Sequence, residues 1–166
     1  MIYLSDYNSK VGKMLIAATD THLCGLWFYG QKHFKRGISG KTEFGQNGIT
    51  KCTKRWLDIY FSGVCPDFTP PLSVYGTDFQ KDVYTALCEI PFGQTVTYGF
   101  IARKVCEKQG KEKMSARAVG AAVGKNPISV IIPCHRVLSK NGSLTGYAGG
   151  TDKKRLLLLT EVCKGV

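Results

Sequence analysis

The chain has 166 residues, with 23 lysines and arginines against 12 aspartates and glutamates, and a formal charge of +11 at pH 7. A chain of this length buries about 70% of the surface that it exposes when unfolded, which is enough for one core or two small ones. No apolar run approaches the ~20 residues of a membrane span, and the N-terminal residues lack a signal-peptide pattern. We therefore expect a cytoplasmic protein whose cysteines are thiols.

The seven cysteines form no Cys-x-x-Cys pair. An odd number without paired spacing argues against a disulfide framework and against an ordinary zinc site. We expect six of the seven to be small buried apolar residues. His22, Cys24 and His33 are near one another in the sequence and leave zinc open there, and we otherwise expect no metal and no cofactor.

The positive charge is concentrated in one part of the sequence, because nine basic and two acidic residues lie between Gly99 and Lys140. One interpretation is a solvated basic face that keeps the protein soluble. The other is a surface for a polyanion, since lysines and arginines that neutralise phosphates release counterions. Charge alone does not decide between the two.

The first 75 residues predict a small sheet followed by a helix. Apolar runs separated by polar turns predict strands, and apolar positions at helical spacing predict a helix. The expected elements are strands at Ile2–Tyr7, Met14–Thr19 and Leu23–Tyr29, a loop at Gly30–Gly48, and a helix from Ile49 to about Gly63. Three prolines then predict an extended connection, so we expect two domains, residues 1–75 and 76–166.

The second part predicts mostly helices. These are expected from Thr77 or Asp78 to Glu89, from Thr97 to a loop at Glu107–Lys113, from Ser115 to Gly124 and from Thr151 to Cys163, with a strand-like stretch at Ser129–Ile132 and a glycine-rich loop at Ser139–Gly150. The second and third of these helices are short, joined by a tight loop, and the third has small side chains. They fit either a helix-turn-helix or an ordinary close-packed helix pair.

Cys134 stands in a different setting from the other cysteines, because Pro133 precedes it and His135 and Arg136 follow it. Positive charge and an imidazole lower the pKa of a thiol, and the thiolate is the nucleophile, so we expect Cys134 to be reactive. Adjacent side chains in extended structure point apart. Direct proton transfer from Cys134 to His135 would therefore need a bridging water or a bend.

Four strings in this part closely resemble the O6-alkylguanine-DNA alkyltransferases, also called methylated-DNA–protein-cysteine methyltransferases: Ser115-Ala-Arg-Ala-Val-Gly120, Asn126-Pro127, Ile131-Ile-Pro-Cys-His-Arg-Val137 and Gly146-Tyr-Ala-Gly-Gly150. The resemblance is strong from about Thr77 to Glu161. Upstream of Thr77, the predicted sheet and helix are only compatible with the layout of the family. It implies an α+β fold, with a small ribonuclease-H-like mixed α/β domain and a mostly helical, winged-helix-like domain that holds a helix-turn-helix.

The resemblance also implies a suicidal, single-turnover DNA repair enzyme. Such an enzyme moves the alkyl group from O6-alkylguanine in double-stranded DNA irreversibly to its own cysteine, without a cofactor. It is expected to act as a monomer. Cooperative binding along DNA and activity on O4-alkylthymine are left open.

The resemblance assigns a role to each residue of a reactive site. Cys134 is implied as the alkyl acceptor, His135 as the base that takes the thiol proton through a water, and Glu161 as the carboxylate that orients His135. Tyr98 is implied as the donor toward the departing base, and Asn126 as the tie between the reactive loop and the helix-turn-helix. The residues implied to line the substrate pocket are Ser129, Tyr147, Ala148 and Gly149.

The same resemblance implies how the base is reached. An O6-alkyl group inside a duplex cannot meet a thiol in line, so the nucleotide must leave the stack. Arg117 is implied to fill the gap that the nucleotide leaves, while small side chains let the helix enter the narrow minor groove. The implied DNA-binding residues are Ser115, Ala116, Arg117, Ala118 and Ala121, whose contacts to the DNA backbone suit any sequence.

Two positions depart from the pattern of some family members. Ala148 replaces a serine, so a hydroxyl contact to guanine O6 is lost, although the backbone N–H can still donate. Ser129 replaces a proline that lines the pocket, which predicts weaker engagement of bulky O6-benzyl groups. Rapid and complete inactivation by O6-benzylguanine would contradict that prediction.

Three other functions remain as alternatives. A lesion sensor of the same fold lacks the acceptor cysteine that this chain has. A Cys-His hydrolase leaves Arg117 and the small-sided helix unexplained. A transcription regulator needs a further DNA-binding or inducer region, for which 166 residues leave no room beyond the small N-terminal domain.

Overall fold

A four-stranded sheet is formed by the first part of the chain in the computed structural model, which describes residues 1–162. Its strands are β1 (Ile2–Ser9), β2 (Gly12–Ala18), β3 (Leu23–Phe28) and β4 (Thr42–Phe44), in the order β3-β2-β1-β4. The pairs β1–β2 and β2–β3 are antiparallel, and β4 adds parallel to β1. The sheet is therefore mixed.

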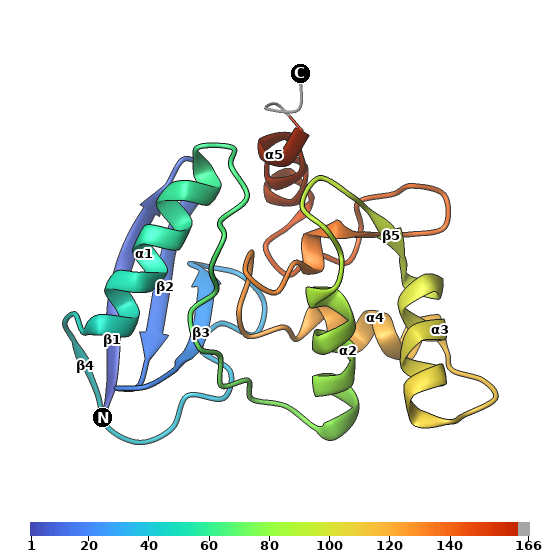
Figure 1. Ribbon diagram of the computed structural model, residues 1–166, viewed down its shortest axis with the longest axis horizontal. Coiled ribbons are helices and arrows are strands. Elements are labelled where there is room, and N and C mark those ends of the chain that lie inside the picture. Colours follow the sequence, from blue (N-terminus) through green and yellow to red (C-terminus); the bar gives the residue numbers. More distant parts are fainter. Residues whose placement is uncertain (163–166) are drawn as a thin grey trace.

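Side chains along each strand point alternately to the two faces of the sheet, and both faces carry apolar residues. On one face Met14, Ile16 and Phe28 belong to the main core, which the helix α1 (Gly48–Phe61) covers (Figure 1). The opposite face holds a second cluster of four residues, Leu4, Leu15, Ala17 and Trp27, against which Phe34 and Ile38 pack. The sheet thus lies between α1 and the loop that follows β3.

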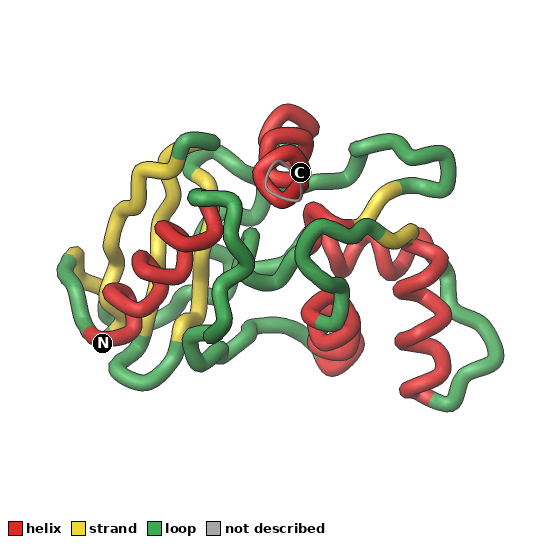
Figure 2. Tube along the Cα trace, turned by 45° about the horizontal axis from the view of Figure 1, so that its top comes forward, coloured by secondary structure: helices red, strands yellow, loops and turns green. Residues whose placement is uncertain are grey.

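Four helices make up most of the second part: α2 (Asp78–Cys88), α3 (Tyr98–Gln109), α4 (Ala116–Gly124) and α5 (Thr151–Val162). Thr77, Thr97 and Ser115 cap the first three by accepting hydrogen bonds from backbone N–H groups of the first turn. A 3₁₀ turn, η1 (Cys134–Arg136), precedes β6 (Val137–Leu138), which pairs in parallel with β5 (Val96–Thr97). In Figures 1 and 2, α5 lies between the sheet and the group α2–α4.

The free edge of β3 attaches the second part to the sheet. Residues 71–73, near the end of the first part, and residues 127–129 of the second part each form a β-bridge with this edge. At the second bridge, Leu26 N–H donates to the Pro127 carbonyl over 2.9 Å, and Ser129 N–H donates to the Leu26 carbonyl over 2.8 Å. The segment that leads to Cys134 is therefore held by the sheet itself.

The expected α+β class is confirmed, and the structure corrects it in detail. The predicted loop at Gly30–Gly48 contains β4, whose three exposed residues show no apolar alternation. The predicted strand at Ser129–Ile132 is wrong, because Val130 has a φ of 70° and the chain turns there. Helix α3 continues past the predicted loop start to a left-handed cap at Gly110. Cys163, the expected end of the last helix, lies outside the described residues.

The cysteines are less buried than expected. Cys106 and Cys134 are buried, while Cys24 and Cys52 are half-buried. Cys65 and Cys88 are exposed, so the prediction of six buried thiols is wrong for these two.

No three His, Cys, Asp or Glu side chains within residues 1–162 gather as a metal-binding group, so the candidates His22, Cys24 and His33 do not form one. Across the same residues, no helix combines the length and the apolar character needed to cross a membrane.

Candidate active site

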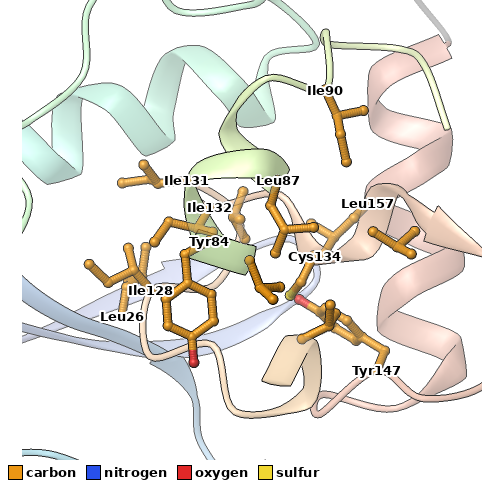
Figure 3. Packing of buried hydrophobic residues seen from close by; sticks show 14 of the residues in the cluster. Leu26, Tyr84, Leu87, Ile90, Ile128, Ile131, Ile132, Cys134, Tyr147 and Leu157 are labelled. Atoms are coloured by element: carbon orange, nitrogen blue, oxygen red, sulfur yellow. The ribbon is translucent and has the colours of Figure 1, made fainter. Parts of the chain in front are cut away.

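Cys134 lies at the start of η1, where Pro133 precedes it and its own N–H donates to the Ile132 carbonyl over 2.8 Å. Its side chain is buried, with 4% of the residue exposed, among apolar neighbours that include Leu87 and Tyr147 (Figure 3). Cys134 and His135 therefore lie in a 3₁₀ turn and not in extended backbone.

Asn126 holds the loop before Cys134 through its side-chain amide. It follows Lys125, the C-cap of α4, and is buried. Its Nδ2 donates to the Ile132 carbonyl over 2.8 Å, and its Oδ1 accepts from Ile128 N–H over 2.9 Å. One amide thus holds both ends of residues 128–132.

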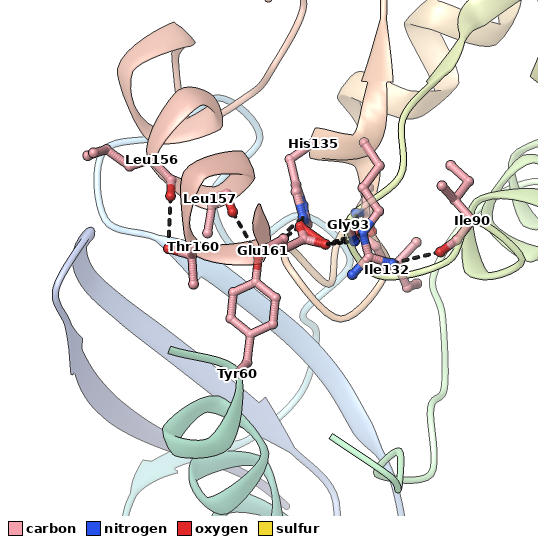
Figure 4. A network of polar contacts seen from close by, with 11 residues as sticks. Tyr60, Ile90, Gly93, Ile132, His135, Leu156, Leu157, Thr160 and Glu161 are labelled. Atoms are coloured by element: carbon pink, nitrogen blue, oxygen red, sulfur yellow. Dashed lines mark hydrogen bonds and ion pairs between the residues drawn. The ribbon is translucent and has the colours of Figure 1, made fainter. Parts of the chain in front are cut away.

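A buried network surrounds the Glu161 carboxylate on α5 (Figure 4). Its Oε2 accepts from His135 Nε2 at 2.6 Å and from the Tyr60 hydroxyl at 3.1 Å. Its Oε1 accepts from Arg136 Nε at 2.6 Å and from Gly93 N–H at 3.2 Å. Four donors from three different segments meet on a side chain that is only 1% exposed.

The charges in this network follow from burial and pairing. Burial alone would raise the pKa of Glu161, but the hydrogen bonds from His135 and Gly93 and the charge of Arg136 hold it below its ordinary value. Burial lowers the pKa of His135 and outweighs the opposing effect of Glu161. The ionised carboxylate therefore receives Nε2–H of a neutral imidazole.

The other ring nitrogen of His135, Nδ1, decides whether this residue can act as a base. Nδ1 is buried and has no hydrogen-bond partner among the described residues. In a neutral imidazole whose Nε2 bears the proton, Nδ1 has a free lone pair. Glu161 thus fixes the tautomer in which Nδ1 can accept a proton.

The thiol itself is not activated in the way that the sequence suggested. Burial raises the pKa of Cys134, although the Asn126 amide and the charge of Lys154 act in the opposite direction. The predicted lowering by neighbouring positive charge is therefore wrong, because desolvation of the thiolate dominates. Cys134 is a neutral thiol at rest and needs a base to react.

Tyr98 and Tyr147 stand on the outer side of this thiol. The Tyr98 hydroxyl donates to the Thr145 carbonyl over 3.2 Å. A Cβ at Gly146, where φ is 92°, would lie 2.7 Å from that hydroxyl, so this position requires glycine. Burial raises the pKa of Tyr147 well above its ordinary value, so its hydroxyl keeps its proton.

The face in front of these tyrosines is the predicted helix-turn-helix. A cavity of about 760 Å³ is lined by nine residues, among them Tyr98, Arg117, Gly120 and Lys140. The predicted DNA-binding residues Ser115, Ala116, Arg117, Ala118 and Ala121 are all exposed. Three of the four alanines of α4, Ala116, Ala118 and Ala121, therefore face solvent, while Ala122 packs in the core.

Sequence reasoning missed three residues that the structure places at the site. Tyr60 was expected only as part of an apolar helix stripe, yet its hydroxyl reaches Glu161. Lys154 is fully buried and donates to the Val137 carbonyl over 2.5 Å, and burial lowers its pKa. Gln31 bonds to Ser129. A lysine or glutamine gives no sequence signal of burial, so these contacts depend on the tertiary fold.

A buried cysteine backed by a carboxylate-held histidine, behind an exposed small-sided helix, defines a nucleophilic site next to a nucleic-acid-binding motif. Two family models match the chain: "6-O-methylguanine DNA methyltransferase, ribonuclease-like domain" over residues 2–74 and "6-O-methylguanine DNA methyltransferase, DNA binding domain" over residues 78–163. The chain belongs to the 6-O-methylguanine DNA methyltransferase family, which confirms the resemblance found in the sequence.

Individual relatives agree over nearly the whole length. The methylated-DNA–protein-cysteine methyltransferase of Methanosarcina acetivorans is 40% identical over 161 residues, which is 96% of this chain and 98% of that protein. The protein of the same name from Mycobacterium bovis is 48% identical over 162 residues, 97% of this chain and 93% of the relative. The crystal structure of Mycobacterium tuberculosis OGT in complex with DNA superposes with a TM-score of 0.82 at 35% identity, covering 96% of this chain and 93% of that one.

Proposed function

We propose that this chain repairs DNA by moving an alkyl group from O6 of guanine in double-stranded DNA to the sulfur of Cys134, once per molecule. The observation that carries this proposal is the free Nδ1 of a neutral His135, held by Glu161 next to a buried thiol. The relatives' names and the DNA complex of the mycobacterial protein support the same reaction.

The chemistry is a single displacement. As the bond between guanine O6 and the alkyl carbon breaks, a bond from that carbon to Cys134 sulfur forms. The thiol proton passes through a water to His135 Nδ1, and Glu161 stabilises the imidazolium. Tyr98 gives its hydroxyl proton to the departing base, so that guanine leaves as a neutral species. Solvent then returns a proton to Tyr98 as the His135 imidazolium loses the proton it gained.

The helix-turn-helix supplies access to the base. The exposed face of α4 fits a minor groove because its side chains are small, and Arg117 takes the place of the rotated nucleotide. Ser129, Tyr147, Ala148 and Gly149 line the pocket that receives the alkylated base. We propose no metal and no cofactor for this reaction.

We also propose that residues 1–75 and 76–166 are two domains of a cytoplasmic monomer. The two family matches at 2–74 and 78–163 support this division. The bridge between β3 and residues 127–129 keeps the two parts together.

A labelled-methyl transfer assay tests the proposal. Duplex DNA with O6-methylguanine should transfer one methyl group per protein molecule, and the Cys134→Ser variant should transfer none. Cys106→Ser, which alters another buried cysteine, is the matched control and should keep full stoichiometry. Transfer by Cys134→Ser at the wild-type level would overturn the proposal.

A further inference from the structure

A glutamine of the sheet part reaches the loop that precedes Cys134. Gln31 lies in the turn after β3 and is 9% exposed. Its Oε1 accepts from Phe28 N–H over 2.8 Å, and Ser129 Oγ lies 3.3 Å from the same oxygen. Because Phe28 N–H can only donate, this amide atom is the oxygen, and the Ser129 hydroxyl must be the donor. The hydroxyl proton of Ser129 is therefore turned toward Gln31.

The same turn also touches the other side of the proposed pocket. Lys32 N–H donates to the Ala148 carbonyl over 3.3 Å. The ring of Phe28 packs under Gly149, where a Cβ would lie 3.4 Å from its Cδ2 atom. Residues 28–32 thus contact Ser129 on one side and Ala148 and Gly149 on the other.

Between Ser129 and Cys134 the chain is strained. Val130 is fully buried and has a φ of 70°, a conformation that β-branched residues rarely adopt. Such strain persists only where neighbouring contacts hold the backbone. On the N-terminal side those contacts are the backbone bridge from Ser129 to Leu26 and the side-chain bond from Ser129 to Gln31.

We propose that Gln31 is a positioning residue that sets the width of the alkyl pocket by holding the Ser129 hydroxyl, and that it thereby limits the size of the alkyl group accepted. This inference rests on the proposed function and names a determinant of its specificity. Without Gln31, only the backbone bridge to Leu26 holds Ser129 on this side, so the Ser129 side chain can move away from the pocket. The pocket then widens and accepts larger alkyl groups, while the catalytic side chains keep their own hydrogen bonds.

The test compares the transfer rates from two duplexes, one with O6-methylguanine and one with O6-benzylguanine. We expect the ratio of methyl to benzyl rates to fall about tenfold in Gln31→Leu, the size of effect that one methylene has in an apolar pocket. Ser129→Ala should lower the ratio similarly, and the double variant should lower it no further, because both changes remove one contact. Gln46→Leu, at an exposed glutamine of the same part, is the control and should leave the ratio unchanged.

Two results would overturn the inference: equal slowing of both substrates in Gln31→Leu, which indicates a structural role alone, or an additive effect in the double variant. If Gln31→Leu does not fold, an unchanged ratio in Ser129→Ala overturns it as well. Failure of the wild-type protein to transfer methyl at all would contradict the proposed function instead.

Discussion

At the residue scale, burial acts on three neighbouring groups with different results. It raises the pKa of Cys134, lowers that of His135, and is outweighed at Glu161 by the donors that meet there. The site therefore holds a neutral thiol, a neutral base and an ionised carboxylate at neutral pH. This is the set of protonation states that a base-assisted displacement needs at its start.

The lowered pKa of His135 predicts the pH dependence of transfer. An ordinary histidine has a pKa of about 6.5, so His135 stays neutral to a lower pH. We expect the transfer rate to stay flat from about pH 8 to pH 6.5 and to decline only below that value. Single-turnover rates across this range measure it. A decline with its midpoint at or above the ordinary histidine pKa would contradict the account.

The free energy of unfolding should fall in the same acidic range. The native forms of His135 and Glu161 bind fewer protons than the unfolded chain does, so stability is lost as the pH drops below about 6.5 and then about 4.3. Denaturant titrations at each pH separate this loss from the kinetic effect. Stability that rises with acid would show that these groups are protonated in the native state.

Removing the charge of Glu161 should damage both activity and stability. In Glu161→Gln the buried Arg136 loses its ion pair, which costs about 3 kcal/mol. His135 loses the group that fixes its tautomer, so we expect transfer to slow about 100-fold.

Tyr60→Phe is the matched variant for Glu161→Gln. It removes one hydroxyl from the same carboxylate but leaves the hydrogen bonds from His135 and Arg136 to Glu161, so we expect less than about a tenfold change in rate. Denaturant unfolding and single-turnover rates measure both variants. A Glu161→Gln protein with the wild-type rate would remove this carboxylate from the mechanism.

At the scale of elements, the sequence predicts what depends on local patterns and misses what depends on distant contacts. The helix-turn-helix was predictable because Thr97 and Ser115 are good helix N-caps and because the alanines of α4 can be read directly from the sequence. The turn at Val130 was not, since a valine with positive φ gives no sequence signal. The proposed reactive residues were named from motifs, whereas the contacts of Gln31, Tyr60 and Lys154 depend on the tertiary fold.

The small side chains of α4 give a prediction at this scale. Ala121 is exposed, so Ala121→Leu leaves the core unchanged but adds bulk to the face proposed to enter the minor groove. We expect DNA affinity to fall about tenfold while the unfolding temperature stays within about 2 °C. Fluorescence anisotropy with a DNA duplex measures the affinity. Unchanged affinity would show that this face of α4 does not touch DNA.

At the scale of the whole molecule, the net charge is +11. Some of the basic residues behind it pair with carboxylates, and others are exposed to solvent. Of the nine basic residues between Gly99 and Lys140, Arg136 is buried against Glu161, and Lys104 and Lys108 pair with Glu89 and Asp82. Five others are exposed: Arg103, Lys111, Lys113, Arg117 and Lys140. The positive surface that the sequence indicated is therefore formed by fewer residues than the nine basic ones between Gly99 and Lys140.

This charge distribution predicts how binding depends on salt. DNA affinity should fall linearly on logarithmic axes as salt rises, because bound phosphates release counterions. Neutralising Lys111 and Lys113, which line the groove beside α3 and α4, should reduce the slope by about 2. Neutralising the exposed Lys10 and Lys41 of the sheet part should leave the slope unchanged. Equal effects of the two pairs would contradict a DNA surface at the helix-turn-helix.

Mass spectrometry of the protein after reaction with a duplex that contains O6-methylguanine tests the central claim most directly. The account predicts that every reacted molecule gains one methylene and that peptide mapping places it on Cys134 among the seven cysteines. A methylene on another cysteine, or no gain in mass with intact O6-methylguanine left in the DNA, would contradict it.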